Sequence, residues 1–398
     1  MRTLRVLCAL ILLVVVPAQA APKKKTPAPG LNARIEAILY QPQMASATWG
    51  VDVLDLTSGK VIYSLNPDHL FLPASNAKLL TTAAALAIAG PDYRFHTTVE
   101  TSGAIDRNGK LLGDLVIVGR GDANLSGRVL PYQTKTARVS PPSQALEELA
   151  DQIMQKGVRM VDGDVVGDDT FYSAERYAEG WAYDDLQWLD GAPVSALSFN
   201  DNVVFFNVHP GSHVGDQATV IMDPDNAYYE LDNRIETSTA GVTRKIGIHH
   251  DLGSSKVSLW GSIPLGDSGL SEAVAIDDPA LFTAEVFRTI LEKRGIIVNG
   301  KARARHSELA QFFDQPLPST PEPSDSGHCC MGGAAPSPTS STLVLAEHVS
   351  LPLVEDVRVT NKTSQNLHAE LLLRLIGKMS GGIGSFEDGS ASLHRFLL

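Results

Sequence analysis

Cysteine is scarce in this sequence, since the 398 residues contain only three. Cys8 lies near the start of the chain, and Cys329 and Cys330 are adjacent in a stretch rich in Gly, Pro and Ser. The fold therefore cannot depend on a disulfide framework. His328 precedes the cysteine pair, but this spacing is not that of a zinc site, and we expect no metal there.

An excess of basic charge is also missing. The formal net charge is −12, because 33 Lys and Arg residues face 45 Asp and Glu residues. A general nucleic-acid binder needs a basic surface to neutralise phosphates, so the composition argues against nucleic acid as a partner. The same charge balance argues against tight binding to anionic lipids.

Long hydrophobic runs are absent after the first twenty residues. At the start, two arginines precede the apolar run Val6–Val16, and Ala18-Gln19-Ala20 is a small-x-small cleavage site. This pattern predicts a secretory signal peptide over residues 1–20, with an uncleaved anchor as the alternative. We expect a flexible leader over residues 21–30 and no transmembrane helix in the mature chain.

The length and a hydrophobic fraction of 43% predict two or three domains with a sizeable core. Residues 316–342 are rich in Pro, Ser and Gly and are expected to form a linker. Helical patterns occupy residues 32–40, 74–89, 143–156, 279–294, 366–377 and 386–398. Strand-like patterns occupy residues 49–56, 60–65, 111–118, 161–166, 202–208, 218–222, 256–259 and 354–359, of which the first two predict a hairpin.

The sharpest chemical signal is the pair Ser75 and Lys78, at the start of the predicted helix 74–89. A spacing of three places both side chains on one helix face. A lysine in a dry pocket can lose its proton and activate a neighbouring serine. The alternative is a serine cap beside a lysine that extends to solvent. The residues after Lys78 carry almost no charge, so we expect the helix to be buried on most sides.

A second signal would be a Ser-x-Asn sequence that presents a hydroxyl and an amide. The chain has three matches, beginning at Ser64, Ser198 and Ser364. Turn chemistry explains the first two. Ser364 and Asn366 lie just before a strong predicted helix, where a loop can direct both side chains into a cleft; a plain N-cap is the alternative.

Together these segments resemble the penicillin-binding serine D-Ala-D-Ala carboxypeptidases of the penicillin-binding protein 4 type, some of which are also endopeptidases. The long separation between the two motifs is typical of that family, whereas class A β-lactamases have a much shorter one. The segments that carry the resemblance are Leu72-Pro73-Ala74-Ser75-Asn76-Ala77-Lys78, Gly119-Arg120-Gly121-Asp122, residues 191–202, Asp277-Asp278-Pro279-Ala280 and residues 361–370.

The resemblance implies a role for each matching residue. Ser75 would be the nucleophile and Lys78 the base that activates it. Ser364 would relay a proton toward the leaving amine, and Asn366 would hydrogen-bond both the substrate and Lys78. The reaction would need no cofactor. Peptidoglycan stem peptides and cross-links would be the substrates, and β-lactams would be covalent inhibitors.

One part of the family pattern is missing, because no Lys-Thr-Gly or Lys-Ser-Gly occurs in the chain. In the family this third motif lies on an edge strand that supplies an oxyanion donor. We therefore interpret the chain as truncated before that strand and expect little or no turnover. The alternative function is a non-catalytic envelope protein that binds peptidoglycan or penicillin.

The resemblance also implies an α/β (α+β) fold. A split penicilloyl-serine-transferase domain, an antiparallel sheet flanked by helices, would be built from residues 31–97 and 343–398. The inserted residues 98–342 would form one or two β-rich domains. The signal peptide and the substrate together predict a periplasmic location.

Overall fold

The computed structural model describes residues 30–132, 141–307 and 342–398. The expected signal peptide, most of the leader, nearly all of the 316–342 linker and the pair Cys329 and Cys330 lie outside these residues. The chain divides into two compact units, Met1–Pro73 and Ala74–Leu398. Each unit is described by itself below.

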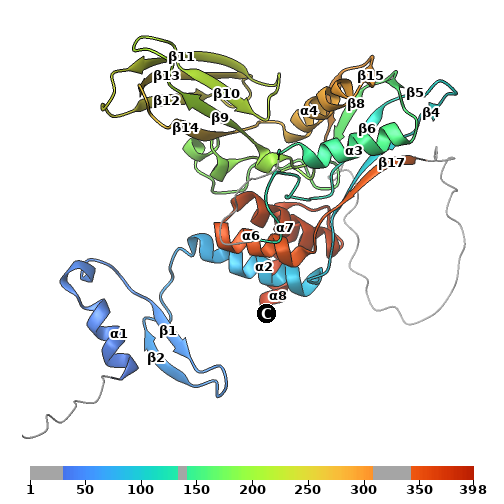
Figure 1. Cartoon of the computed structure of the whole chain (residues 1–398). Coiled ribbons are helices and arrows are strands. Elements are labelled where there is room, and N and C mark those ends of the chain that lie inside the picture. Colours follow the sequence, from blue (N-terminus) through green and yellow to red (C-terminus); the bar gives the residue numbers. More distant parts are fainter. Residues whose placement is uncertain (1–29, 133–140, 308–341) are drawn as a thin grey trace, which may run out of the picture. The chain divides into compact units, whose positions relative to one another are not determined.

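The first unit contains a helix and the predicted hairpin (Figure 1). Helix α1 spans Leu31–Leu39 and is followed by the short helix η1, Pro42–Met44. Strands β1 (Val51–Leu54) and β2 (Val61–Leu65) pair antiparallel, which confirms the predicted hairpin. The carboxylate of Asp55 accepts hydrogen bonds from the Thr57 and Ser58 amides and so fixes the turn.

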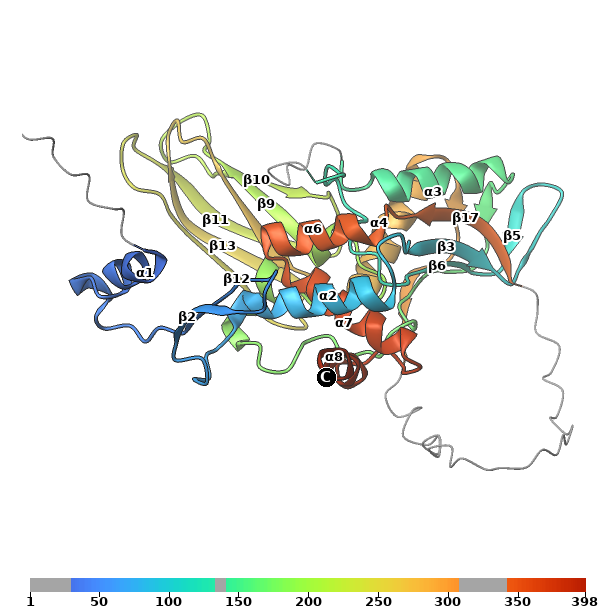
Figure 2. The same cartoon turned by 90° about the horizontal axis from the view of Figure 1, so that it is seen from below.

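The second unit contains a group of packed helices (Figures 1 and 2). Their shared apolar core includes Ala84, Ala85, Leu371, Leu372 and Leu375, all of which are buried. The helices are η2 (Ala74–Asn76), α2 (Ala77–Ile88), α6 (Leu353–Thr363), α7 (Asn366–Met379) and α8 (Phe386–Leu397). The predicted helices at 74–89, 366–377 and 386–398 are thereby confirmed.

Two expectations for these helices are wrong. The segment 354–359 was predicted to be a strand because it is rich in β-branched residues, but it lies within helix α6. Leu353, Val357 and Thr360 lie on one buried helical face, and tertiary packing overrides β-propensity there. Helix α2 is buried on one face only, because the side chains of Leu79 and Leu80 are 56% and 44% exposed.

The second unit also contains a five-stranded mixed sheet, and two further helices pack against it. Strand β17 forms one of its two edges and pairs antiparallel with β3. The sheet order is β16 (Ala302–Arg305), β8 (Val165–Asp168), β6 (Leu115–Val118), β3 (His96–Thr101) and β17 (Leu343–Val349).

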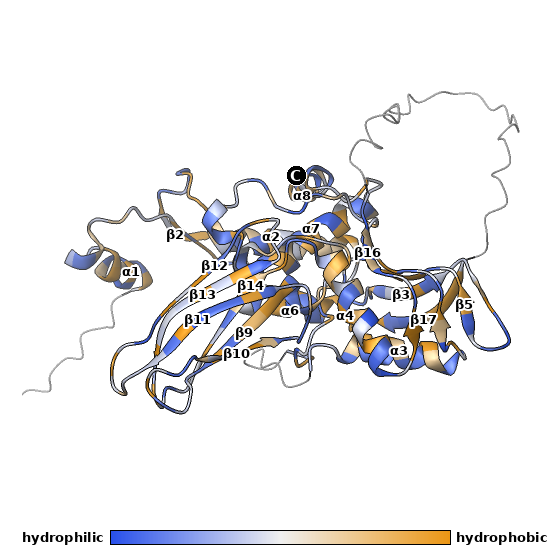
Figure 3. Cartoon of the chain, turned by 90° about the horizontal axis from the view of Figure 1, so that it is seen from above, coloured by the Kyte–Doolittle hydropathy of each residue, from blue (hydrophilic) through white to orange (hydrophobic). Residues whose placement is uncertain are grey.

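Helices α3 (Gln144–Gln155) and α4 (Pro279–Lys293) confirm the helices predicted at 143–156 and 279–294. Helix α3 has both hydrophobic and hydrophilic bands in Figure 3, and its apolar residues, such as Leu146 and Leu149, are buried. The carboxylate of Asp278 caps α4 by accepting a hydrogen bond from the Leu281 amide.

The remaining strands form three smaller sheets, which makes the inserted region β-rich as expected. One contains β15 (Ile297–Val298), β7 (Met160–Val161), β5 (Lys110–Leu112) and β4 (Ala104–Ile105). The second contains β10 (Thr219–Asp223), β9 (Val203–His209) and β14 (Leu270–Ala275). The third contains β11 (Glu230–Ser238), β13 (Lys256–Pro264) and β12 (Lys245–His250). Three short helices lie between β8 and β9, namely η3 (Tyr183–Asp185), η4 (Leu189–Gly191) and η5 (Asn200–Asn202).

The fold class is therefore α/β (α+β), as predicted. Among the residues that the structure describes, no helix is both long enough and apolar enough to cross a bilayer.

Candidate active site

Ser75 lies in the short helix η2, directly before α2. Ala74 has a φ of 45°, a left-handed conformation that turns the chain sharply before the serine. The Lys78 Nζ donates a hydrogen bond to the Ser75 Oγ over 3.1 Å. The structure thus brings together the two residues of the first motif, as their spacing predicted.

The surroundings of Lys78 shift its protonation equilibrium toward the neutral form. Burial lowers the pKa of the Lys78 amine below its usual value, although the nearby carboxylates of Asp190 and Glu370 act in the opposite direction. A lowered pKa increases the fraction of amine that can accept a proton near neutral pH. Lys78 can therefore act as a base toward the hydroxyl that it contacts.

Ser364 reaches the same place from the end of helix α6. It has a φ of 60°, and its Oγ donates a hydrogen bond to the Ser75 Oγ over 2.7 Å. The Asn361 amide donates to the Thr82 hydroxyl over 3.1 Å and so joins α6 to α2. Ser75 and Ser364 are thereby held within hydrogen-bonding distance, although 289 positions separate them in the sequence.

Asn366 lies at the first position of α7 and lines the same pocket as Ser75 and Lys78. Its Nδ2 donates a hydrogen bond to the backbone oxygen of Asp190 over 2.8 Å. The expected bond to Lys78 is not among the hydrogen bonds of the described residues. The Asn366 amide bonds the backbone carbonyl of Asp190, in helix η4, instead of Lys78.

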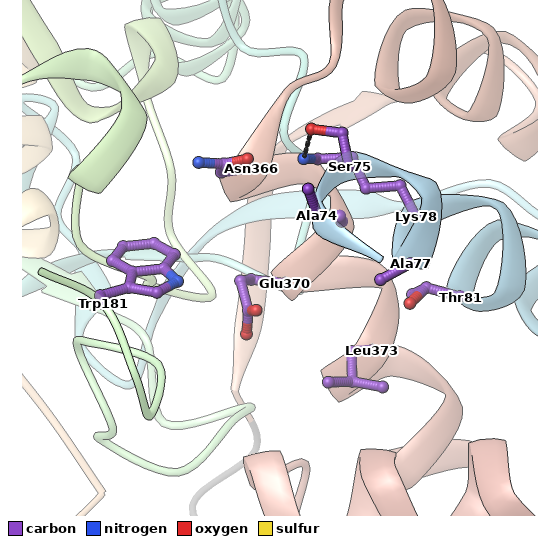
Figure 4. A pocket seen from close by; sticks show the side chains of 10 residues that line it. Ala74, Ser75, Ala77, Lys78, Thr81, Trp181, Asn366, Glu370 and Leu373 are labelled. Carbon is purple, nitrogen blue, oxygen red and sulfur yellow. Dashed lines mark hydrogen bonds between the residues drawn. The ribbon is translucent and has the colours of Figure 1, made fainter. Parts of the chain in front are cut away.

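A pocket of about 400 Å³ opens beside Ser75. Figure 4 shows Ser75 and Lys78 on one side of it and Trp181 on the other, with Glu370 between them. The Glu370 carboxylate is held by the buried Arg374, whose Nη1 donates to it over 2.7 Å. The pocket therefore offers a hydroxyl, an amine, an amide, a carboxylate and an aromatic ring to a bound molecule.

Trp181 and Glu370 were not assigned to the site from the sequence. The structure places the half-buried ring of Trp181 in the pocket wall. Glu370 belongs to the segment 361–370, and its position one helical turn after Asn366 on α7 is the signal that could have identified it.

The structure also describes two further candidates from the sequence, the Ser64 match and a metal site. Asn66, at the end of the Ser64 match, has a φ of 49° and forms a turn, as predicted. In the parts of the chain that the structure describes, no three His, Cys, Asp or Glu residues are grouped so that they could hold a metal ion.

A buried charged cluster lies behind the second motif. The Nδ1 of His368 is 2.7 Å from the carboxylate of Asp356, and its Nε2 is 3.4 Å from that of Asp201. Burial opposes the charged imidazole, but the two carboxylates dominate and raise the pKa of His368 from 6.5 to about 9. His368 is therefore a buried imidazolium at neutral pH.

This cluster predicts how stability depends on pH. A histidine with a raised pKa stabilises the fold below its unfolded pKa of 6.5, and this contribution is lost as pH rises through its folded pKa of about 9. The free energy of unfolding of the wild type relative to His368→Gln should thus fall between pH 6.5 and 9, because glutamine does not titrate. Urea unfolding across this range measures the difference, and a pH-independent difference would contradict the assignment. The other charged groups facing His368 are Asp122, Asp201 and Asp356, and they remain in both proteins.

The chain is similar to known carboxypeptidases. The D-Ala-D-Ala carboxypeptidase 3 (S13) family matches residues 31–317 and 332–398. A D-alanyl-D-alanine carboxypeptidase of an Actinomadura species is 31% identical over 373 residues, which are 92% of this chain and 61% of that protein. The D-alanyl-D-alanine carboxypeptidase DacB of Haemophilus influenzae is 22% identical over 325 residues, which are 81% of this chain and 57% of that protein. The chain thus spans about three fifths of the length of these relatives.

Solved structures show the same fold. Penicillin binding protein 4 of Haemophilus influenzae superposes with a TM-score of 0.66 at 20% identity, over 87% of this chain and 66% of that chain. Its complex with a β-lactam gives a TM-score of 0.59 at 18% identity, over 87% of this chain and 65% of that chain. The arrangement of helices and sheets described above therefore occurs in that protein as well.

Proposed function

This chain belongs to the D-Ala-D-Ala carboxypeptidase 3 (S13) family, and we propose that it is a serine-type D-Ala-D-Ala carboxypeptidase that acts on peptidoglycan peptides through an acyl-enzyme on Ser75. The observation that carries the proposal is the position of the Ser75 Oγ, which accepts hydrogen bonds from both Lys78 and Ser364. A serine beside a partly desolvated amine has the arrangement that nucleophilic catalysis requires.

The proposed reaction has two steps. In the first, neutral Lys78 takes the proton of the Ser75 hydroxyl while the Oγ attacks the carbonyl carbon between the two D-Ala residues. The C–N bond then breaks, and the leaving amine receives the proton from Lys78 through the Ser364 hydroxyl. In the second step, water attacks the ester, passes its proton back along the same groups and regenerates Ser75.

Asn366 would orient the substrate in this reaction. Its side chain lies at the pocket, where its amide can bond the peptide backbone of a bound substrate in place of the Asp190 carbonyl. Holding the scissile carbonyl at the distance of attack supplies a large share of the rate in such reactions.

The absent Lys-Thr-Gly motif affects the expected rate. In the family that the chain resembles, the strand with this motif supplies one oxyanion donor. The loss of one such donor costs about 10²–10³-fold in rate. We therefore propose that this 398-residue chain is acylated slowly and turns over substrate poorly.

Benzylpenicillin tests the proposal directly. We expect intact-mass spectrometry of the full chain to show one covalent adduct, which peptide mapping assigns to Ser75. Release of D-Ala from a peptide that ends in D-Ala-D-Ala is measured in parallel. An adduct at another residue, or no adduct after prolonged incubation, would overturn the proposal. Reversible penicillin binding without an adduct would support the non-catalytic envelope protein instead.

We also propose a location, a domain organisation and a second peptidase activity for this chain. Residues 1–20 would direct the chain to the periplasm, where residues 31–97 with 343–398 would form the catalytic part and residues 98–342 the insert. Cross-linked peptides would be cleaved by an endopeptidase activity at the same serine, and β-lactams would acylate it. Incubation with purified cross-linked muropeptides compares the two peptidase activities.

A further inference from the structure

A left-handed turn in the inserted region is not explained by the proposed chemistry. Asn200, Asp201 and Asn202 have φ values of 54°, 55° and 56° and are all buried. For residues other than glycine, each left-handed conformation costs free energy, and three in succession are rare. Such strain persists only where the surrounding contacts determine it. Asn200 and Asn202 are held by local hydrogen bonds to Val203 and Pro193, whereas the contacts of Asp201 lead to the second motif.

The turn directs the Asp201 carboxylate toward the second motif. Its Oδ2 accepts a hydrogen bond from the Nε2 of Gln365 over 2.9 Å and also pairs with Arg128. Its Oδ1 lies 3.4 Å from the Nε2 of His368. The side chains of Asp201, Arg128 and His368 are 1%, 4% and 0% exposed, so the charged groups of this cluster are buried.

Gln365 connects this cluster to the reacting groups because it is the middle residue of the second motif. Its side chain is buried against Asp201, while its neighbour Ser364 hydrogen-bonds the Ser75 Oγ and its neighbour Asn366 lines the Ser75 pocket. Its backbone amide donates to the Thr360 oxygen over 3.2 Å. Holding Gln365 at both its side chain and its backbone therefore fixes the left-handed conformation of Ser364.

We propose that Asp201 is a positioning residue, which holds Gln365 so that Ser364 reaches the Ser75 Oγ. The inference rests on the proposed function, and it gives the inserted region a role in the catalytic geometry beyond forming a neighbouring domain. Asp201 acts through Gln365 and does not itself touch the reacting atoms.

The first test compares two substitutions at one position. Asp201→Ala removes the acceptor of Gln365, whereas Asp201→Asn keeps an acceptor oxygen and tolerates the left-handed backbone. We expect the rate constant of acylation by saturating benzylpenicillin to fall about ten- to hundredfold in Asp201→Ala, the scale of a small misplacement of a reacting group. The concentration at half-saturation should change little, and Asp201→Asn should restore most of the rate.

A double variant tests the route through Gln365. If Asp201 acts only by holding this side chain, Gln365→Leu should slow acylation to a similar extent, and the double variant should be no slower than the slower single variant. Additive losses would overturn the proposed route.

The matched control is Asp168→Asn. Asp168 is another buried carboxylate that pairs with an arginine, Arg305, but it lies in strand β8 of the five-stranded sheet. We expect this variant to lower the unfolding temperature while leaving the acylation rate of the folded protein unchanged. Equal rate losses in Asp168→Asn and Asp201→Ala would show that stability alone explains the effect and would overturn the inference.

Hydrogen exchange gives a readout that does not depend on activity. The Gln365 amide should exchange faster in Asp201→Ala than in the wild type, while the amides of helix α4 stay unchanged. Unchanged exchange at Gln365 overturns the inference even if the wild type is never acylated. A wild type without an adduct at Ser75 overturns the proposed function, so the two failures are distinguishable.

Discussion

Replacing Ser75 by alanine is expected to abolish covalent labelling by benzylpenicillin. The Ser75 Oγ is the atom on which Lys78 and Ser364 converge, and alanine leaves them with no atom that can form an ester. Loss of a catalytic serine costs on the order of 10⁶-fold in rate, which removes D-Ala release from the measurable range. Intact-mass spectrometry and D-Ala release measure the two effects.

Ser392→Ala is the matched control for this prediction. Ser392 is a buried serine of helix α8, in the same compact unit, and its hydroxyl donates to the Asp388 oxygen within its own helix. We expect it to be labelled at the wild-type rate. Because Ser75 is exposed, Ser75→Ala should unfold at nearly the same temperature as the wild type. A covalent adduct that persists in Ser75→Ala would refute the role of this serine.

Replacing Lys78 by arginine has the second largest expected effect. Arginine keeps the positive charge and can still donate to the Ser75 Oγ, but it does not lose its proton in proteins and so cannot act as a base. General base catalysis contributes typically 10²–10⁴-fold, and we expect acylation to slow on that scale. A stopped-flow or mass-based time course of penicillin labelling measures it.

The pH profile supplies a second measurement for Lys78. Because burial lowers its pKa, the wild-type acylation rate should rise with pH and reach a plateau below 10.5, the ordinary lysine value. This rising limb should disappear in Lys78→Arg. Lys256→Arg, in strand β13 and paired with Asp232, is the control and should retain the wild-type profile. Normal acylation by Lys78→Arg would show that the charge suffices and that a proton acceptor is not needed.

Local patterns predicted most of the secondary structure. The hairpin at 49–65 follows from β-forming residues on both sides of Thr57-Ser58-Gly59, and helix α4 follows from the helical pattern at 279–294. Helix α6 was missed because Val354, Val357 and Val359 favour a strand by propensity. Only its packing against α2 and α7 shows that the apolar residues lie on one helical face.

The extent of burial of helix α2 was also not predictable from composition. A nearly uncharged sequence is compatible with burial on every side, but exposure depends on which neighbours pack against the helix. In the described residues α2 packs against α6, α7 and α8, and Leu79 and Leu80 remain exposed on another face.

The sequence by itself determined the first motif, because a spacing of three across one helical turn brings Ser75, in η2, next to Lys78, in α2. The sequence also contains the second motif, and the resemblance to the family depends on the two motifs together. The tertiary structure decided which groups support these motifs. Trp181 in the pocket wall and Asp201 against Gln365 come from segments far away in the chain, and no local pattern encodes their distances. The physical reason is that helical periodicity acts over a few residues, whereas the contact between Asp201 and Gln365 spans 164 positions and depends on how the inserted region folds back onto the helices.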